Sequence, residues 1–320
     1  MGNELRKSAN NVEPRARCDL LVIGAGPAGL TCGMYAARAG LRVAVFEKTA
    51  AGGQLAQTDR IENYPGFAQG QGGFELAWSM KEQAERFGVE TISEEVLSLD
   101  LGAERKLAIT PFGAYAAKAV VVATGARPRK LGLPGEEELT GRGISYCATC
   151  DGGFFRDKTV AVIGGGNTAV ADALYLSRIA KKVYLIHRRG EFRATAIYDE
   201  RIQATENIQT VLNASVTDLH RSNDVLDGIS VIHNDSQATE HLAVDGLFVA
   251  VGTVPNTEFL ADQLKLTESG YIVAGEIGET NVPLVYAAGD VRQKALRQVV
   301  TAVADGAQVA ETAAHRLSIC

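Results

Sequence analysis

Short apolar runs that lead into glycine turns organise this chain. The run Leu20 to Ile23 enters a turn with three glycines, which is followed by a stretch rich in small residues and by a second apolar run that ends at Phe46. An apolar run of this length, bounded by turn residues and followed by a helix, is typical of a strand in a parallel sheet. The pattern predicts a β-α-β unit between Asp19 and Lys48.

The same pattern occurs a second time. Residues Thr159 to Arg188 align without a gap on the first unit. The first turn reads Gly24-Ala-Gly26-Pro27-Ala28-Gly29, and the second reads Gly164-Gly-Gly166-Asn-Thr-Ala169. The first glycine allows the tight bend, the second lets a pyrophosphate approach at the helix N-terminus, and the third allows close packing of helix on strand. We therefore predict two nucleotide-binding units.

Three later apolar runs indicate that one unit is nested in the other. They end at Gly125, Gly252 and Asp290. Proline stands near both expected junctions, at Pro128 and Pro255, which suits short connections between domains. We predict an α/β protein with two Rossmann-like, three-layer nucleotide-binding domains, in which a discontinuous domain of residues 1–128 and 253–320 encloses one of residues 129–252.

The residue that ends the second strand differs between the two units. Glu47 ends the first, where a carboxylate accepts hydrogen bonds from a ribose diol and repels a 2′-phosphate. His187 ends the second and is followed by Arg188 and Arg189, with Arg193 expected one helical turn further on. Guanidinium groups bind a 2′-phosphate through charge-assisted hydrogen bonds, although a solvated cationic patch is the alternative. The first site is predicted to prefer an unphosphorylated adenosine and the second NADPH.

An acidic residue closes the last of the later runs. Asp290 follows Gly289 at the expected end of a strand. A carboxylate there can hold a polyol, such as the ribityl chain of a flavin. It can equally cap the next helix, so the local sequence leaves both roles open.

Charge and cysteine content narrow the class of protein. The 320 residues carry a net charge of −6, which argues against a nucleic acid partner. The charged first 17 residues hold no apolar segment typical of a secretory signal, and the uncharged run Leu20 to Ala37 contains four glycines and Pro27, so neither export nor a membrane span is predicted. Five cysteines make a sparse, odd set, which indicates a reducing cytoplasm.

The sequence Cys147-Ala-Thr-Cys150-Asp151 is the chemical centre. Two cysteines with two residues between them can close a small disulfide ring poised for thiol exchange. Half of a zinc site is the alternative, but the chain has no second such pair and its histidines lack paired ligand spacing, so no metal is predicted. Asp151 can transfer protons to or from a thiolate or can cap a helix. Electron flow from a nicotinamide to this disulfide needs a two-electron intermediary, and a flavin supplies one.

Together these residues resemble the low-molecular-weight thioredoxin reductases, from about Cys18 onward. The larger glutathione-reductase-like enzymes carry their cysteine pair just after the first acidic strand end, where residues 52–57 hold no cysteine. The matching motifs, in chain order, are GAGPAG, GGQ at Gly52 to Gln54, ENYPG at Glu62 to Gly66, ATG at Ala123 to Gly125, CATCDG, GGGNTAV, HRR with FRA at Phe192 to Ala194, and AAGDV followed by Arg297-Gln298.

The resemblance implies a homodimer that passes electrons from NADPH through FAD and the Cys147–Cys150 disulfide to thioredoxin or a thioredoxin-like protein. Cys150 would face the flavin and Cys147 would attack the thioredoxin disulfide. By the match, the residues that bind FAD are Gly24, Gly26, Pro27, Ala28, Gly29, Glu47, Lys48, Gly53, Gln54, Asn63, Thr124, Gly125, Asp290, Arg297 and Gln298. Those that bind NADPH are Gly164, Gly166, Asn167, Thr168, His187, Arg188, Arg189 and Arg193.

Some features depart from the family pattern or leave other activities open. Ala171-Asp172 stands where the family commonly has two glutamates and Asp305 where many members have glycine, and both departures are interpreted as tolerated variation. Cys320 is interpreted as a spare thiol. Reduction of a peroxiredoxin-like or glutaredoxin-like partner, oxidation of small dithiols by oxygen, and electron transfer to ferredoxin or flavodoxin are the alternative activities. The intact HRR motif argues against oxidation of small dithiols by oxygen. The cysteine pair would be superfluous for electron transfer to ferredoxin or flavodoxin.

Overall fold

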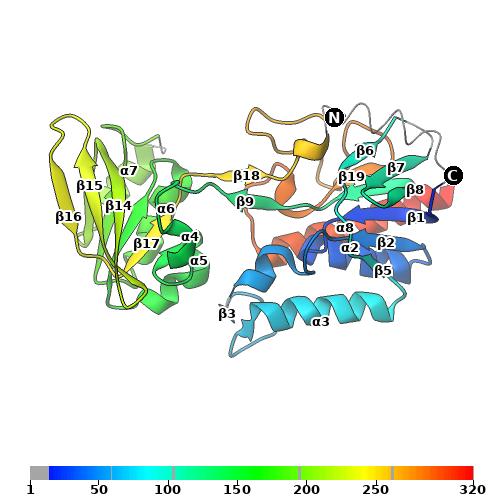
Figure 1. Ribbon diagram of the computed structural model, residues 1–320, viewed down its shortest axis with the longest axis horizontal. Helices are drawn as coiled ribbons and strands as arrows, with labels where there is room; N and C mark the ends of the chain where they lie inside the picture. Colours follow the sequence, from blue (N-terminus) through cyan, green and yellow to red (C-terminus); the bar gives the residue numbers. More distant parts are fainter. Residues whose placement is uncertain (1–13, 59, 103–104, 194–195, 261–262, 320) are drawn as a thin grey trace. The chain divides into compact units, whose positions relative to one another are not determined.

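A computed structural model of the chain describes residues 14–58, 60–102, 105–193, 196–260 and 263–319. The charged N-terminal segment up to residue 13, Ala194 of the FRA motif and the terminal Cys320 lie outside these residues. The chain forms two compact units (Figure 1). The first takes the described residues of Met1–Arg127 and Val254–Cys320, and the second takes Pro128–Thr253.

A seven-stranded sheet forms the centre of the first unit. Its order is β5-β2-β1-β8-β7-β6, and β19 also pairs with β8. The pairs among β5, β2, β1, β8 and β19 are parallel, and β6 and β7 are antiparallel to their neighbours. The strands are β1 (Ala16–Ile23), β2 (Val43–Phe46), β5 (Glu90–Ile92), β6 (Ser98–Asp100), β7 (Lys106–Thr110), β8 (Gly113–Val122) and β19 (Val285–Ala287).

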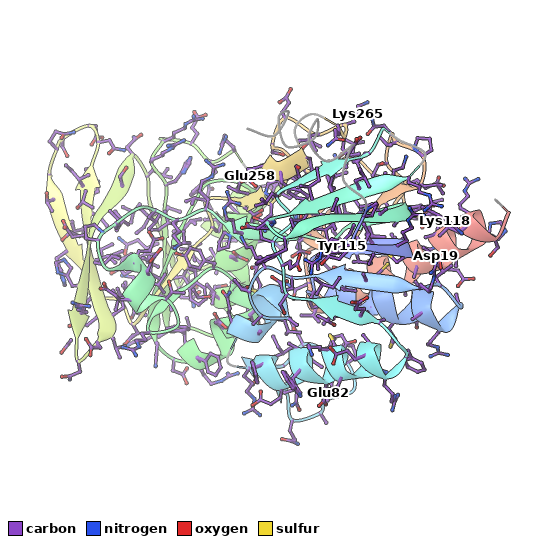
Figure 2. All side chains as sticks on the ribbon, turned by 45° about the vertical axis from the view of Figure 1, so that its right-hand side comes forward. Asp19, Glu82, Tyr115, Lys118, Glu258 and Lys265 are labelled. Carbon is purple, nitrogen blue, oxygen red and sulfur yellow. A yellow bond between two sulfur atoms is a disulfide. The ribbon has the colours of Figure 1, made fainter. Side chains whose placement is uncertain are left out.

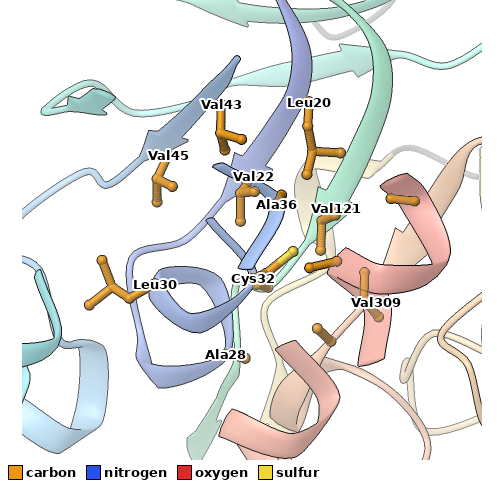
Figure 3. Close-up of a cluster of buried hydrophobic side chains, with 14 of the residues drawn as sticks. Leu20, Val22, Ala28, Leu30, Cys32, Ala36, Val43, Val45, Val121 and Val309 are labelled. Atoms are coloured by element: carbon orange, nitrogen blue, oxygen red, sulfur yellow. The ribbon is translucent and has the colours of Figure 1, made fainter. Parts of the chain in front are cut away.

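Two helices from opposite ends of the chain cover one face of this sheet. α2 (Pro27–Arg38) and α8 (Val299–Ile319) pack on each other and on β1, β2 and β8 (Figure 3). The helices can approach closely because Gly306 of α8 carries no side chain, and a Cβ there would lie 2.3 Å from the carbonyl oxygen of Ala28. α3 (Gly73–Arg86) packs beside α2. The other face is buried under Leu260, Leu264 and Ile272.

A five-stranded parallel sheet forms the centre of the second unit. Its order is β10-β17-β11-β12-β13. One face packs against helix α6, and the other packs against an antiparallel three-stranded sheet, so the unit has three layers. The strands are β10 (Ile144–Ser145), β11 (Thr159–Ile163), β12 (Lys182–Ile186), β13 (Ile208–Val211) and β17 (Gly246–Val249), with β14 (Ala214–Ser222), β15 (Val225–His233) and β16 (Thr239–Leu242) in the smaller sheet. The helices are α4 (Glu136–Leu139), α5 (Ala148–Asp151), η2 (Gly152–Phe155), α6 (Asn167–Leu176) and α7 (Ala196–Gln203).

Short elements complete the fold. The two segments that join the units, β9 (Ala126–Pro128) and β18 (Thr253–Pro255), pair as a two-stranded sheet. Both predicted β-α-β units are present, as β1-α2-β2 and β11-α6-β12, and the predicted α/β fold class is confirmed. The remaining elements are η1 (Gly53–Gln57), β3 (Arg60–Ile61), β4 (Gln71–Gly72), η3 (Glu258–Leu260) and η4 (Gly289–Val291).

Ion pairs join β1 and β8 close to the start of β2. Asp19 of β1 lies 3.2 Å from Lys118 of β8 and 3.3 Å from Arg42, which precedes β2 (Figure 2). Burial raises the pKa of Asp19, but hydrogen bonds from Arg42 and Lys118 outweigh it and leave that pKa below its ordinary value. The nucleotide turns lie at the carboxyl ends of these strands, as in other open α/β sheets.

Candidate active site

The turn after β1 leaves backbone accessible to a phosphate group. Gly24 has φ +106°, and a Cβ there would lie 2.5 Å from the carbonyl oxygen of Ala123. Around Gly26 no atom lies within 4 Å of the position a Cβ would take. Helix α2 begins directly afterwards, with Pro27 in the first position, where its missing N–H costs nothing. The first turn of α2 can therefore offer backbone N–H groups to an anion.

Glu47 faces this turn from the end of β2. Its Oε2 accepts the N–H of Ala25 at 3.1 Å, and its Oε1 accepts the N–H of Thr49 at 3.2 Å. The half-buried carboxylate is thereby held next to the glycines, while Lys48 points to solvent. Gly53 also comes to the turn, since a Cβ on it would lie 3.6 Å from the Cα of Gly26.

Hydrogen bonds tie the end of β8 to the segment where the first unit resumes. The Thr124 hydroxyl donates to the carbonyl of Asn256 at 2.7 Å, and the Asn256 amide donates to the carbonyl of Thr124 at 2.8 Å. The N–H of Asn256 donates to the carbonyl of Gly125 at 3.0 Å. The side-chain amide of Gln54 donates to the carbonyl of Ala126. Asn256 was not predicted as a site residue, because its role depends on contacts that are remote in sequence.

Three of the predicted FAD residues meet near the start of α8. The amide of Asn63 donates to the side-chain oxygen of Gln298 at 3.0 Å, across a sequence separation of 235 residues. The guanidinium of Arg297 lies 4.1 Å from the ring centre of Tyr271, and its Nε lies 3.4 Å from the carbonyl of Asp290. The structure therefore brings Asn63, Arg297 and Gln298 to the same end of the unit as Asp290.

Asp290 carries a buried oxygen that lacks a protein partner. Its Oδ1 is buried and has no hydrogen bond with any described residue. Burial, opposed in part by the charges of Lys294 and Arg297, raises the pKa of Asp290 above its ordinary value. The residue lies inside η4, whose N-cap is Ala288, so the alternative role as a cap of that helix is not realised. A buried acceptor without a partner is costly, and a ligand hydroxyl is the kind of group that satisfies it.

Asp305 of α8 supports this corner. Its carboxylate accepts the N–H of Gly289 at 2.9 Å and forms ion pairs with Lys294 at 2.9 Å and Arg292 at 3.3 Å. The interpretation of Asp305 as tolerated variation therefore missed its part in holding the turn that carries Asp290. The local sequence gave no signal of these contacts, because Arg292 and Lys294 lie 13 and 11 residues before Asp305.

The raised pKa of Asp290 predicts opposite effects on stability and on flavin binding. The folded flavin-free protein holds the carboxyl proton more tightly than the unfolded chain, so its stability falls as pH rises through the pKa range of this group. Asp290→Asn removes that cost and should raise the Tm of the flavin-free protein at pH 7. It should weaken FAD binding about 10- to 100-fold, the usual effect of losing a charged hydrogen-bond acceptor.

Thermal melts of flavin-free protein between pH 4 and 8, together with FAD titrations, check this prediction. Asp227→Asn, at an exposed position of β15, is the control and should change neither quantity. A lower Tm at pH 7 or an unchanged FAD affinity in Asp290→Asn would contradict it.

The second unit repeats the glycine turn. No atom lies within 4 Å of the position that a Cβ on Gly166 would take. Asn167 and Thr168 begin α6 and are exposed beside it. A Cβ on Gly164 would lie 2.4 Å from the carbonyl oxygen of Ala250, which parallels the close approach of Gly24 to Ala123 in the first unit.

His187, directly after β12, carries a buried imidazole. Its Nε2 is buried and has no hydrogen bond with any described residue, and its ring stacks on Phe192 at a centroid distance of 5.8 Å. Burial, followed by the charges of Arg193, Arg189 and Arg188, lowers the pKa of His187 below its ordinary value. The imidazole is therefore neutral at pH 7, and the three guanidinium groups lie close enough to influence it.

These three arginines are exposed, and none forms an ion pair within the described part of the chain. The expected helical turn between Arg189 and Arg193 was wrong, because residues 190–193 are not helical. Arg193 is instead held by its N–H, which donates to the carbonyl of Gly165 at 2.7 Å. The glycine turn itself therefore brings Arg193 near His187, which helical periodicity could not have predicted.

Cys147 and Cys150 form a disulfide with a Cα–Cα distance of 5.3 Å. Both residues are half-buried, with Cys147 immediately before α5 and Cys150 within it. The preceding residue, Tyr146, donates its hydroxyl to Glu136 at 2.8 Å, and Glu136 is buried and also accepts N–H groups of Leu131 and Gly132. The loop that carries the disulfide is thereby fixed to the core of the second unit.

Asp151 accepts a hydrogen bond from a residue that the sequence did not single out. The hydroxyl of Ser145 lies 2.6 Å from Oδ2 of Asp151. Asp151 occupies the N-cap of η2 but makes no side-chain capping hydrogen bond there, so the alternative capping role is not realised. Ser145 gave no sequence signal, because a serine six residues before an aspartate becomes its partner only through the turn at α5.

The described residues place the candidate FAD residues in the first unit, and the candidate NADPH residues and the disulfide in the second. Within this part of the chain, no group of three or more His, Cys, Asp or Glu side chains could hold a metal ion. None of the described helices is both long enough and apolar enough to cross a bilayer.

Comparison with known proteins identifies relatives along nearly the whole chain. Residues 18–306 match the family described as "Pyridine nucleotide-disulphide oxidoreductase". The "Thioredoxin reductase" of Streptomyces clavuligerus is 44% identical over 303 residues, which cover 94% of both chains. That of Bacillus subtilis (strain 168) is 39% identical over 297 residues, covering 93% of this chain and 94% of the relative. The crystal structure of thioredoxin reductase from Streptococcus pyogenes MGAS5005 is 41% identical, has a TM-score of 0.87 and covers 95% of this chain and 99% of its own.

Proposed function

Because the chain belongs to the pyridine nucleotide-disulphide oxidoreductase family and, within it, to the thioredoxin reductases, we propose that it reduces the disulfide of thioredoxin or a thioredoxin-like protein with electrons from NADPH. Flavin and pyridine nucleotide use is common to that family. The observation that carries the proposal is the half-buried Cys147–Cys150 disulfide in the unit that also holds the second nucleotide turn. A thiol pair with two intervening residues is suited to exchange with another disulfide.

The residues of the first unit fit FAD. The buried Oδ1 of Asp290 can accept a ribityl hydroxyl, and Glu47 beside the glycine turn can accept a ribose diol. Gly26 leaves room for a pyrophosphate at the start of α2. We assign Asn63, Arg297 and Gln298 to the flavin end of the same site.

The residues of the second unit fit NADPH. Gly166 leaves room for the pyrophosphate at the start of α6, where Asn167 and Thr168 are exposed. A carboxylate directly after β12 would repel a 2′-phosphate, but the residues that follow this strand are His187, Arg188 and Arg189. The Arg-rich surface supports a preference for NADPH over NADH.

A flavin bound in the first unit would convert the hydride chemistry of a nicotinamide into the thiol chemistry of a disulfide. Once the pair is reduced, the Cys147 thiolate attacks the partner disulfide and one partner sulfur leaves with the bonding electrons. The Cys150 thiolate then attacks Sγ of Cys147, which restores the Cys147–Cys150 bond and releases the second partner sulfur. Asp151 supplies a proton to a departing thiolate. In sum, NADPH and one proton convert a disulfide to a dithiol and leave NADP⁺.

We also propose assembly as a homodimer, which the resemblance implies, and a cytoplasmic location, which the sparse cysteines indicate. Sedimentation of the purified flavoprotein measures the first, and fractionation of cells that make the protein measures the second.

The experiment that tests the activity is NADPH oxidation by the purified protein with and without oxidised thioredoxin. We expect turnover that requires thioredoxin and yields its dithiol. Turnover with ferredoxin or flavodoxin alone, or dithiol-dependent oxygen uptake that outpaces NADPH oxidation, would contradict the proposal.

A further inference from the structure

Ser145 lies at a rigid position directly before the redox loop. It is the last residue of β10, pairs with Phe248 of β17 and is 4% exposed. Cys147 follows two residues later. The turn of α5 brings the Asp151 carboxylate back to the Ser145 hydroxyl. A buried hydroxyl on a sheet strand is held in place far better than one on a surface loop.

The Ser145 hydroxyl has three polar contacts but only one proton. Its oxygen lies 2.6 Å from Oδ2 of Asp151, 3.1 Å from the N–H of Cys147 and 3.3 Å from the carbonyl oxygen of Cys147. The Cys147 N–H donates to it in any state. The single hydroxyl proton can therefore go either to the Asp151 carboxylate or to the Cys147 carbonyl, but not to both.

These two acceptors match the two protonation states of Asp151. When Asp151 is a carboxylate, the Ser145 hydroxyl donates to Oδ2, and a hydrogen bond to an ionised acceptor is the stronger kind. When Asp151 is a carboxylic acid, its proton can be donated to the Ser145 oxygen, and the Ser145 hydroxyl turns to the Cys147 carbonyl. Neither state leaves the buried hydroxyl without a partner.

We propose that Ser145 is a positioning residue that holds Asp151 for proton transfer and exchanges its donor role as Asp151 gains and loses the proton. This inference rests on the proposed function. In the step concerned, Cys150 attacks Sγ of Cys147 in the mixed disulfide, the bond from Cys147 to the partner breaks, and the partner sulfur leaves with the electron pair. The Asp151 acid gives this sulfur its proton and becomes a carboxylate that Ser145 stabilises. Water then returns a proton to Asp151.

The effects of other ionisable groups near the loop on a pH profile must be distinguished from that of Asp151. Tyr146 and Glu136 bond to each other, and burial together with that bond raises the pKa of Tyr146 to about 12, so Tyr146 stays protonated in any assay near neutrality. Helix α6 packs against α5 and carries Asp172, where burial raises the pKa to about 6. Asp172 can therefore add its own inflection to a pH profile, and Asp172→Asn identifies that inflection.

The test is the rate at which prereduced holoenzyme reduces thioredoxin, measured in a single turnover between pH 6 and 10. Ser145→Ala should lower this rate about tenfold and leave the KM for thioredoxin within about twofold. Where this rate falls at alkaline pH, the fall should move to higher pH in Ser145→Ala, because the Asp151 carboxylate loses a hydrogen-bond donor. Ser145→Thr keeps the hydroxyl and should restore both quantities.

A double-mutant cycle separates positioning of Asp151 from a general structural effect. In Asp151→Asn the alkaline fall assigned to this group should vanish, and adding Ser145→Ala should cost less than about twofold more. Ser177→Ala is the matched control, because Ser177 also bonds a backbone carbonyl in the second unit, that of Leu174 at 2.9 Å, and should leave the rate unchanged.

Two results would overturn the role of Ser145: a Ser145→Ala rate equal to the wild type, or a loss that is the same at every pH and fully additive with Asp151→Asn. Failure of the proposed function is a separate outcome, since it would appear as wild-type holoenzyme that does not reduce thioredoxin at all.

Discussion

The Cys147→Ser and Cys150→Ser variants should each lose thioredoxin reduction by at least about a thousandfold while NADPH still reduces their flavin. A serine hydroxyl does not ionise near neutrality and does not form a bond that a thiol can exchange, so neither variant can close or reopen the disulfide. Flavin reduction by NADPH precedes any use of the pair. Stopped-flow flavin absorbance and steady-state thioredoxin reduction measure the two stages separately.

The two variants should differ in what they trap. Cys150→Ser keeps the Cys147 thiolate that attacks thioredoxin but lacks the thiol that resolves the mixed disulfide. It should therefore accumulate a covalent adduct with thioredoxin, visible by mass spectrometry without reductant, whereas Cys147→Ser should not. An adduct formed only by Cys147→Ser would reverse the two roles.

Cys18 provides the control for cysteine replacement. It is half-buried, and burial raises the pKa of its thiol to about 12, so it holds almost no thiolate at pH 7. Cys18→Ser should keep thioredoxin reduction near the wild-type rate. Loss of NADPH-driven flavin reduction in both Cys147→Ser and Cys150→Ser would show that the replacements damage more than thiol exchange.

The parts of the fold that the sequence predicted well are those set by short-range patterns. The runs Leu20 to Ile23 and Thr159 to Ile163 became the buried strands β1 and β11, and both glycine turns became strand-to-helix junctions. Each requirement is local, because a strand buried on both faces needs apolar residues and a tight bend needs glycine. The antiparallel sheet β14-β15-β16 was not predicted, since its register depends on pairing between strands and on the core beneath it.

The candidate site residues also fall into two groups: those that local patterns predict and those that are placed by contacts between distant segments. Glu47, His187 and the cysteine pair follow from their positions after strands or from their spacing. Contacts between distant segments left no such signal: Asn63 meets Gln298 across 235 residues, and Asp305 of α8 meets Gly289 through the packing of the first unit. The error at Arg193 has the same origin, because its N–H is held by the carbonyl of Gly165 and not by a helix.

Replacing Arg188 and Arg189 together by glutamine should raise the KM for NADPH about 100-fold or more while changing that for NADH less than about threefold. Each lost charge-assisted contact to a 2′-phosphate is worth about 1.5–3 kcal/mol, or roughly 10- to 100-fold. NADH carries a hydroxyl at that position and does not use those contacts, so only one of the two cofactors is affected. Steady-state kinetics with each nucleotide, at fixed ionic strength, measure the ratio.

Arg178→Gln separates recognition of the 2′-phosphate from a change in overall charge. Arg178 is an exposed arginine of the same unit, following α6 and lining a separate small surface pocket with Tyr175 and Arg201. Its loss removes a positive charge of the second unit without touching the end of β12, so it should leave the NADPH to NADH ratio unchanged. An equal rise in KM for both nucleotides in the Arg188 and Arg189 variant would mean that these side chains support the unit generally and do not read the 2′-phosphate.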